Sequence, residues 1–177
     1  MARYDAEHKQ SALDNAAIRE LALTYVGRFA TSRAKLSRYL RRKLTERGWD
    51  GEGAADDAVS ALVVRFAELG YVDDGGYARV KASSMERRGL GERRITAALR
   101  ADGISDDDRA DVADQISDGA WEAAHIFARR RRFGPYARDV ADPKQQEKHL
   151  AAFLRAGHNM DIARRWVEAA PGEVPEE

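Results

Sequence analysis

The residues best suited to chemistry in this chain are two adjacent aspartates in the stretch ELGYVDDGGYARV, residues 68–80. Asp73 and Asp74 stand beside two glycines and between two helical patterns. A carboxylate pair can move protons or bind a metal, but either role needs partners that converge on one point. An aspartate before a helix has a simpler role, because it accepts hydrogen bonds from the unpaired N–H groups of the first turn. We interpret Asp73 and Asp74 as structural caps, with Gly75 and Gly76 easing the turn.

Other reactive residue types form no recognisable site. The four histidines are His8, His125, His149 and His158. No two of them have the i, i+4 spacing of a helical zinc motif. The segment RRGLGERR contains only Gly89 and Gly91 and follows a helical pattern, so it is not a phosphate-binding loop. We therefore expect no catalytic residue, no metal site, no bound cofactor and no enzymatic activity.

The composition indicates a folded protein without a strong overall electrostatic field. The chain has 177 residues, 44% of them hydrophobic, which is enough for a packed core. Basic and acidic residues number 30 each, so attraction to a polyanion must come from local patches. There is no cysteine, the first residues lack a signal-peptide pattern, and no apolar run approaches the roughly 20 residues that span a bilayer. We expect a soluble, cytoplasmic protein with no membrane partner.

Apolar residues recur at helical spacing along the chain, and no alternating β-pattern interrupts them. The first three stripes are Ile18, Leu21, Ala22, Tyr25, Val26 and Phe29; Leu36, Leu40 and Leu44; and Val59, Leu62, Val63 and Phe66. Each stripe has residues three or four apart, which lie on one face of a helix. The sequence therefore predicts an all-α fold.

Three glycines that follow helical patterns indicate an internal repeat. Gly48, Gly103 and Gly157 are separated by 55 residues (48 to 103) and 54 residues (103 to 157). Glycine suits the left-handed residue just past a helix end, so we interpret all three as helix caps. A period near 55 residues fits three short helices and their turns. We expect nine helices in three tandem three-helix repeats that form an elongated, curved molecule.

The expected boundaries follow from these patterns and from cap signals. The first helices of the repeats are predicted at 14–28, 74–88 and 118–133, and the third helices at 54–69, 106–117 and 161–170. Ser32, Ser105 and Asp142 are predicted N-caps, with Gln145 completing a capping box. The three repeats are then 14–70, 71–117 and 118–170, with loose termini at 1–13 and 171–177.

Basic residues are concentrated between residues 28 and 47, where only Glu46 opposes them. On a helical projection, Lys35, Arg38 and Arg42 form a face opposite the apolar stripe. Taken singly, such residues keep a helix in solution and complement its dipole. Taken as a set that recurs near the junction of first and second helices, they form a stripe suited to a long anionic partner. Both interpretations stay open; the residues that we select as contacts are Lys35, Arg38, Arg42, Arg93, Arg94, Arg130 and Arg131.

The segments LGYVDDGGYA and RRGLGERRITAALRADGIS resemble the central part of the RecX family of bacterial recombination regulators. The residues that carry the likeness are Leu69, Gly70, Tyr71, Val72, Asp73, Asp74, Tyr77, Ala78, Gly89, Gly91, Arg94, Ile95, Leu99, Gly103 and Ile104. The resemblance runs from about residue 14 to residue 170. It is weaker in the third repeat, where a longer connection, FGPYARDVADP, precedes the second helix.

The resemblance implies a regulator of RecA and not an enzyme. Family members consist of three tandem three-helix repeats, bind RecA and its filament on DNA, and restrain ATP hydrolysis, strand exchange and filament growth. We accordingly expect RecA and the RecA–DNA filament as partners, weak direct contact with DNA, and a monomer. The seven contact residues selected above follow from charge and expected exposure, not from the family.

Two rival functions stay open on the sequence alone. The first is a free-standing DNA-binding regulator, because short three-helix units resemble helix-turn-helix modules. The expected third helices, however, carry the acidic segments ADDAVSALVVRFAE and DDDRADVADQIS, which phosphates would oppose. The second is a hydrolase that uses Asp73 and Asp74, for which we find no partner groups.

Overall fold

The computed structural model describes residues 11–177, and the secondary structure of this part of the chain is helical. The elements are α1 (Asn15–Val26), α2 (Arg33–Arg47), α3 (Ala55–Glu68), α4 (Asp74–Glu86), α5 (Glu92–Ala101), α6 (Asp106–Ala110), α7 (Ala113–Asp118), α8 (Ala120–Arg131), the 3₁₀-helix η1 (Gly134–Tyr136), α9 (Pro143–Ala156) and α10 (Met160–Glu168). The predicted all-α fold is confirmed.

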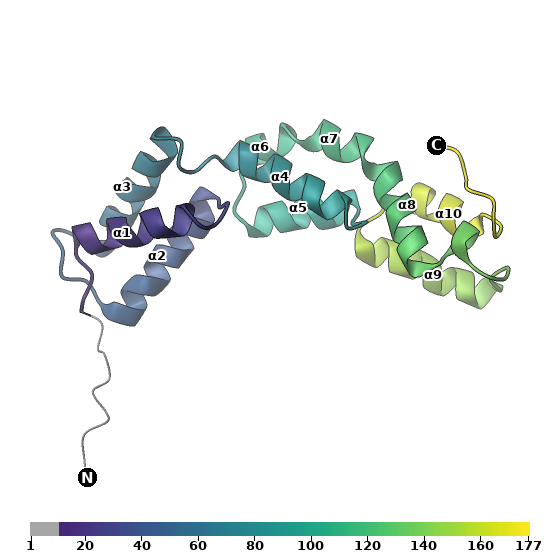
Figure 1. Cartoon of the computed structure of the whole chain (residues 1–177), viewed down its shortest axis with the longest axis horizontal. Helices are drawn as coiled ribbons and strands as arrows, with labels where there is room; N and C mark the ends of the chain where they lie inside the picture. The colour runs from purple at the N-terminus through teal and green to yellow at the C-terminus, as the bar shows by residue number, and fades with distance from the viewer. Residues whose placement is uncertain (1–10) are drawn as a thin grey trace, which may run out of the picture. The chain divides into compact units, whose positions relative to one another are not determined.

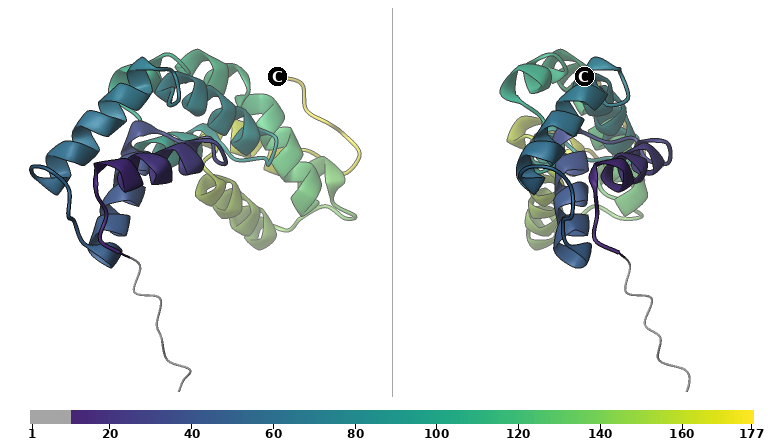
Figure 2. Two further views of the ribbon diagram at one scale, coloured as in Figure 1. Left: turned by 60° about the vertical axis from the view of Figure 1, so that its left-hand side comes forward. Right: turned by 90° about the vertical axis from the view of Figure 1, so that its left-hand side faces the viewer.

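The chain divides into two compact units, the first ending at Tyr77 and the second running from Ala78 to Glu177. The boundary lies inside α4. In the first unit α1, α2 and α3 pack against one another (Figure 1). In the second, α10 packs against α8 and α9, and the two further views show the same grouping (Figure 2). The division into three repeats stays a prediction, since residues 78–177 form a single compact unit.

The core of the first unit contains the predicted apolar stripes. Its buried residues are Ile18, Ala22, Leu36, Leu40, Val59, Val63, Phe66 and Val72. Helices α1 and α2 begin at side-chain caps: Asp14 Oδ1 accepts from the N–H of Ala17 at 2.7 Å, and Ser32 Oγ accepts from the N–H of Lys35 at 3.2 Å. Each cap satisfies a backbone donor that the helix itself cannot pair.

The N-terminal boundary differs from the expectation of a loose segment at 1–13. Residues 1–10, including His8, lie outside the described residues. Leu13, however, is fully buried, with 0% of its surface exposed. Its N–H donates to Gly48 O at 3.0 Å and its carbonyl accepts from Asp50 N–H at 2.9 Å. A single apolar residue has no periodicity, so the sequence pattern gave no sign of this short parallel pairing.

The segment expected as one helix at 106–117 is two helices, α6 and α7. Ser105 caps α6 as predicted, its Oγ accepting from the N–H of Asp108 at 3.0 Å. Between the helices Val112 has φ −110° and ψ 3°, outside the helical region, and is fully buried. Residues 11–177 therefore contain ten α-helices instead of the nine expected. No glycine or proline marks the break, so helical periodicity alone did not reveal it.

In the second unit a cluster around Trp166 joins α8, α9 and α10. Its buried residues are Ala124, Ala128, Phe133, Ala152, Phe153, Ala163, Trp166 and Val167. The predicted capping box of α9 is present: Asp142 Oδ1 accepts from Gln145 N–H at 2.8 Å, and Gln145 Oε1 accepts from Asp142 N–H at 3.1 Å. The segment 171–177, expected to be loose, also contacts this unit, because Gly172 N–H donates to Pro135 O at 2.9 Å.

Candidate interaction cleft and the residues around it

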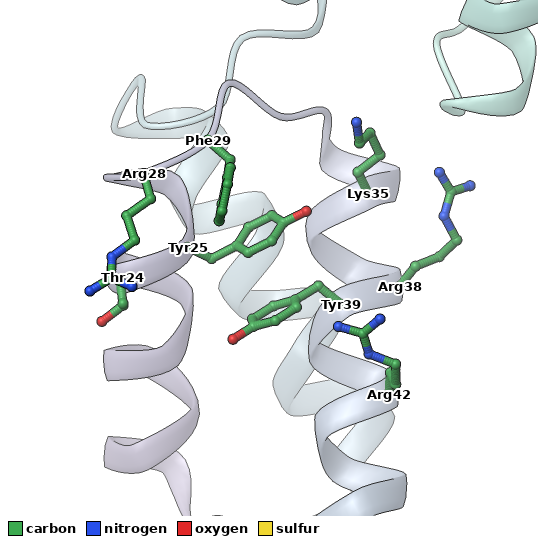
Figure 3. Close-up of a pocket in the computed structure, with 8 residues that line it drawn as sticks. All are labelled: Thr24, Tyr25, Arg28, Phe29, Lys35, Arg38, Tyr39 and Arg42. Atoms are coloured by element: carbon green, nitrogen blue, oxygen red, sulfur yellow. The ribbon is translucent and has the colours of Figure 1, made fainter.

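A cleft of about 630 Å³ lies between α1 and α2 in the first unit (Figure 3). Its lining residues are Thr24, Tyr25, Arg28, Phe29, Lys35, Arg38, Tyr39 and Arg42. Three of the seven predicted contact residues, Lys35, Arg38 and Arg42, therefore face one cleft. Among the described residues, the lining contains four cations, three aromatic rings and no carboxylate.

The aromatic side chains form a continuous group in this cleft. The rings of Tyr25 and Tyr39 are stacked, with centroids 4.1 Å apart and planes 15° apart. The ring of Phe29 packs against Tyr25 at 5.4 Å, and 57% of Phe29 is exposed. The sequence pattern placed Tyr25 and Phe29 in the apolar stripe of the core, which is wrong for Phe29. Tyr39 was missed, although an aromatic residue next to Arg38 and one helical turn from Arg42 is a readable signal.

The cations of the cleft differ in their partners. Lys35 Nζ donates to the hydroxyl of Tyr77 at 2.9 Å and lies 5.1 Å from the centroid of that ring. The Arg42 guanidinium lies 5.7 Å from the Tyr39 ring centroid, and its Nε is 3.5 Å from Glu46 Oε1. Arg28 and Arg38 are exposed and form no ion pair with the described residues.

Glu46 is the carboxylate beside the cleft, although it does not line it. Its hydrogen bond from Lys43 lowers the pKa of Glu46, and the positive charges of Lys43 and Arg42 act in the same direction. Glu46 is therefore ionised at neutral pH. The ion pair with Arg42 is solvent-exposed, and such pairs contribute little to stability. Arg42 is therefore able to exchange Glu46 for an external anion at small cost.

The adjacent aspartates Asp73 and Asp74 have different hydrogen-bond partners. Asp73 Oδ1 accepts from the N–H of Gly76 at 2.9 Å, which is the geometry of an N-cap at the start of α4. Asp74 is 7% exposed, and its two oxygens accept from the backbone N–H of Arg33 at 2.8 Å and from Arg33 Nε at 2.9 Å. Asp74 thus satisfies the first turn of α2 across 41 positions of sequence. The sequence pattern predicted Asp74 as a cap at the start of its own helix and gave no sign of its bonds to α2, since nothing local links the two segments.

The three predicted cap glycines all have positive φ angles: 85° at Gly48, 77° at Gly103 and 97° at Gly157. At Gly157 the backbone also comes close to the start of α5. Gly91 N–H donates to Ala156 O at 3.0 Å, and Arg93 N–H donates to Gly157 O at 3.1 Å. A Cβ built on Gly91 would lie 2.4 Å from the carbonyl carbon of Gly157. The end of α9 therefore meets the beginning of α5 backbone to backbone.

The remaining predicted contacts lie in the second unit. Arg93 and Arg94 are exposed in the first turn of α5, and Arg93 Nη2 also donates to His158 O at 3.1 Å. Arg130 Nη1 donates to Arg88 O at 2.9 Å, and Arg131 lies 5.6 Å from the ring centroid of Phe133. Arg130 and Arg131 border a smaller cleft of about 380 Å³ with Arg88, Leu90 and Phe127.

No group of three or more histidine, aspartate or glutamate side chains in residues 11–177 has the arrangement of a metal site. Over the same residues no helix is both long enough and apolar enough to cross a membrane. Asp73 and Asp74 accept hydrogen bonds at the starts of α4 and α2. Among the described residues, no group of metal-binding side chains includes them.

Residues 11–177 have an all-helical fold, and the first unit contains a cleft lined by basic and aromatic side chains. No family model matches the sequence. The chain is 32% identical to the regulatory protein RecX of Myxococcus xanthus over 161 residues, which cover 85% of this chain and 83% of the relative. It is 33% identical to the regulatory protein RecX of Halorhodospira halophila over 157 residues, with 87% and 88% covered.

Solved structures have the same fold. The crystal structure of RecX from Lactobacillus salivarius is similar with a TM-score of 0.60 at 21% identity, covering 84% of this chain and 91% of that one. A second crystal structure of a regulatory protein RecX has a TM-score of 0.61 at 17% identity, covering 84% and 68%. Because the relatives from Myxococcus xanthus and Halorhodospira halophila are 32% and 33% identical over most of the chain, the chain belongs to the RecX family of regulatory proteins.

Proposed function

We propose that this protein binds RecA and its nucleoprotein filament and inhibits ATP hydrolysis, strand exchange and filament growth, so that it modulates recombination and DNA repair. Membership of the RecX family carries this proposal, because the likeness to curated relatives extends over most of the chain. In this proposal the protein is a cytoplasmic monomer, needs no cofactor, performs no catalysis and makes some direct contact with DNA.

The distribution of charged side chains supports a binding role spread over several places. Six of the seven proposed contact residues are exposed and Lys35 is half-buried. The members are Lys35, Arg38, Arg42, Arg93, Arg94, Arg130 and Arg131. They occur in both compact units, so one molecule offers separate contacts. Weak contacts on one chain reinforce each other, because the first to form raises the effective concentration of the rest.

The experiment that tests this function is the ATPase of RecA on single-stranded DNA, measured while purified protein is added. We expect hydrolysis to fall at sub-stoichiometric to equimolar protein. Light scattering or electron microscopy of the same samples should show slower filament growth. Unchanged hydrolysis at equimolar protein, with the added chain shown to be folded by circular dichroism, would contradict the proposal.

A further inference from the structure

We propose that the cleft between α1 and α2 is a binding site for single-stranded DNA, which holds bases against its aromatic rings and phosphates against its arginines. This inference rests on the proposed function for its biological setting and names the site of direct DNA contact. It does not need RecA, so the two can fail separately.

The rings supply a surface on which unpaired bases stack. Tyr25 and Tyr39 already form a stacked pair, and Phe29 extends the group toward solvent with 57% of its surface exposed. Every base has a flat π-face, so stacking of this kind tolerates any sequence. An exposed phenylalanine at the mouth of a cleft is costly to leave in water and is covered when a base lies on it.

The cations flank the rings on both sides. Figure 3 shows Arg28 in the turn after α1 and the side chains of Lys35, Arg38 and Arg42 on α2, with Tyr25 and Tyr39 between the two helices. A guanidinium donates two parallel hydrogen bonds to a phosphate, which fixes both position and orientation. A strand that runs through the cleft can therefore place its bases on the rings while its backbone meets arginines.

The combination favours an unpaired strand over two other anions. In a duplex the base faces are already stacked within the helix, so the rings would gain nothing and only the arginines would contribute. An acidic peptide would meet the arginines but offers carboxylates without a π-face. The cleft volume, about 630 Å³, lies in the range of roughly 300–1,000 Å³ that is common for ligand sites.

Fluorescence anisotropy with a labelled oligothymidylate of about 15 nucleotides, without RecA, tests the arginines. The double variant Arg38→Gln/Arg42→Gln should bind about tenfold more weakly. The slope of log K against log salt should also fall by about 1.4, which is the loss of two phosphate contacts on a single strand. The matched control Arg41→Gln/Arg65→Gln removes two exposed arginines that pair with Asp56 and Glu68 outside the cleft. It should retain the wild-type slope.

A second pair of probes separates stacking from charge. Phe29→Leu keeps an apolar side chain but removes the π-face. Because Phe29 is largely exposed, the substitution should leave the folded structure intact. It should weaken binding of oligothymidylate about fivefold or more. It should leave unchanged the weaker binding of an abasic strand with the same number of phosphates. Equal losses on the two strands would overturn the stacking role of the cleft.

The remaining outcomes decide the identity of the ligand. Duplex DNA that binds as tightly as the single strand, or polyglutamate of equal charge that competes equally well, would overturn the proposal. An oligouridylate of the same length should bind with similar affinity, and a clear preference for it would overturn the assignment to DNA. Equal loss of binding in Arg38→Gln/Arg42→Gln and in the control Arg41→Gln/Arg65→Gln would overturn the proposal. It would mean that the strand is attracted by the overall charge of the protein and not by the cleft. None of these results alters the RecA ATPase measurement.

Discussion

Nε2 of His158 and the carbonyl oxygen of Gly89 lie 3.1 Å apart in the interior of the second unit, where 2% of His158 is exposed. A carbonyl oxygen only accepts, so Nε2 carries the proton and the neutral ring is held in one tautomer. Burial lowers the pKa of His158 to about 4, while the bond to Gly89 opposes this shift. The residue thus connects the Gly89–Gly91 segment to the end of α9. Because Nε2 donates in the neutral and in the charged ring alike, it is burial that disfavours the charged form.

Acid should weaken the second unit through His158. The pKa of the folded state, about 4, lies below the ordinary value of 6.5, so the unfolded chain binds the proton first. Stability is therefore complete above pH 6.5 and declines as the pH falls toward 4, by on the order of 3 kcal/mol. Urea unfolding at several pH values measures this. His158→Gln, whose amide can still donate to Gly89 but does not titrate, should show a decline smaller by that amount. Identical profiles would exclude the histidine as the cause.

Gly91→Ala should destabilise the second unit by about 1–3 kcal/mol, because the new Cβ would overlap backbone atoms that cannot swing away. The nearest of these are the Gly157 carbonyl carbon and the His158 nitrogen, each 2.4 Å from the built Cβ. Denaturant unfolding gives the free energy directly. Gly27→Ala is the control: its φ is −69° and its nearest neighbour is 3.2 Å away, so the change there should be small. A Gly91 variant as stable as this control would mean that α5 and α9 approach less closely than described.

The two adjacent aspartates should respond differently to asparagine. Asp73→Asn keeps an oxygen for the N–H of Gly76 and should cost a few tenths of a kcal/mol, whereas Asp73→Ala should cost about 1 kcal/mol. Asp74→Asn removes the negative charge of a buried side chain that pairs with Arg33. It should lower the free energy of unfolding by about 1–3 kcal/mol. Thermal unfolding of the three variants ranks them. Equal effects of both asparagine variants would remove the distinct role of Asp74 at the start of α2.

Charge reversal at the cleft should weaken the regulation of RecA. Arg38→Glu/Arg42→Glu places two negative charges where the proposed contacts are positive, and both positions are exposed, so the helix should still form. We expect the concentration that halves RecA ATP hydrolysis to rise about tenfold or more, because like charges now face an anionic partner. Arg41→Glu/Arg65→Glu carries the same net charge on surfaces away from the cleft. If both variants inhibit as the parent does, the cleft has no part in the regulation.

Much of the helical organisation could be predicted because it depends on local physics. The stripe of Leu36 and Leu40 and the caps at Ser32 and Asp142 are properties of neighbours in sequence, and the structure has them in those roles. The core prediction for Phe29 was wrong because α1 ends at Val26, so Phe29 lies beyond the helix whose periodicity would place it in the core. The prediction of one continuous helix at 106–117 was wrong because no glycine or proline marks the break at Val112 in the sequence.

The basic residues of the candidate cleft could be predicted from the sequence, but the stacking of its aromatic rings could not. The charges of Lys35, Arg38 and Arg42 and their common face follow from helical spacing alone. The stacking of Tyr25 on Tyr39 depends on how α1 packs against α2, and no spacing within either helix specifies it.

The sequence by itself determined the helices, most of their caps and the outward face of the basic residues, since each depends on groups within about one turn of one another. Only the tertiary structure decided the partners of Asp74, Gly91 and His158. Those contacts join segments tens of residues apart, and their energies come from burial and close backbone approach, which exist only after the chain has packed.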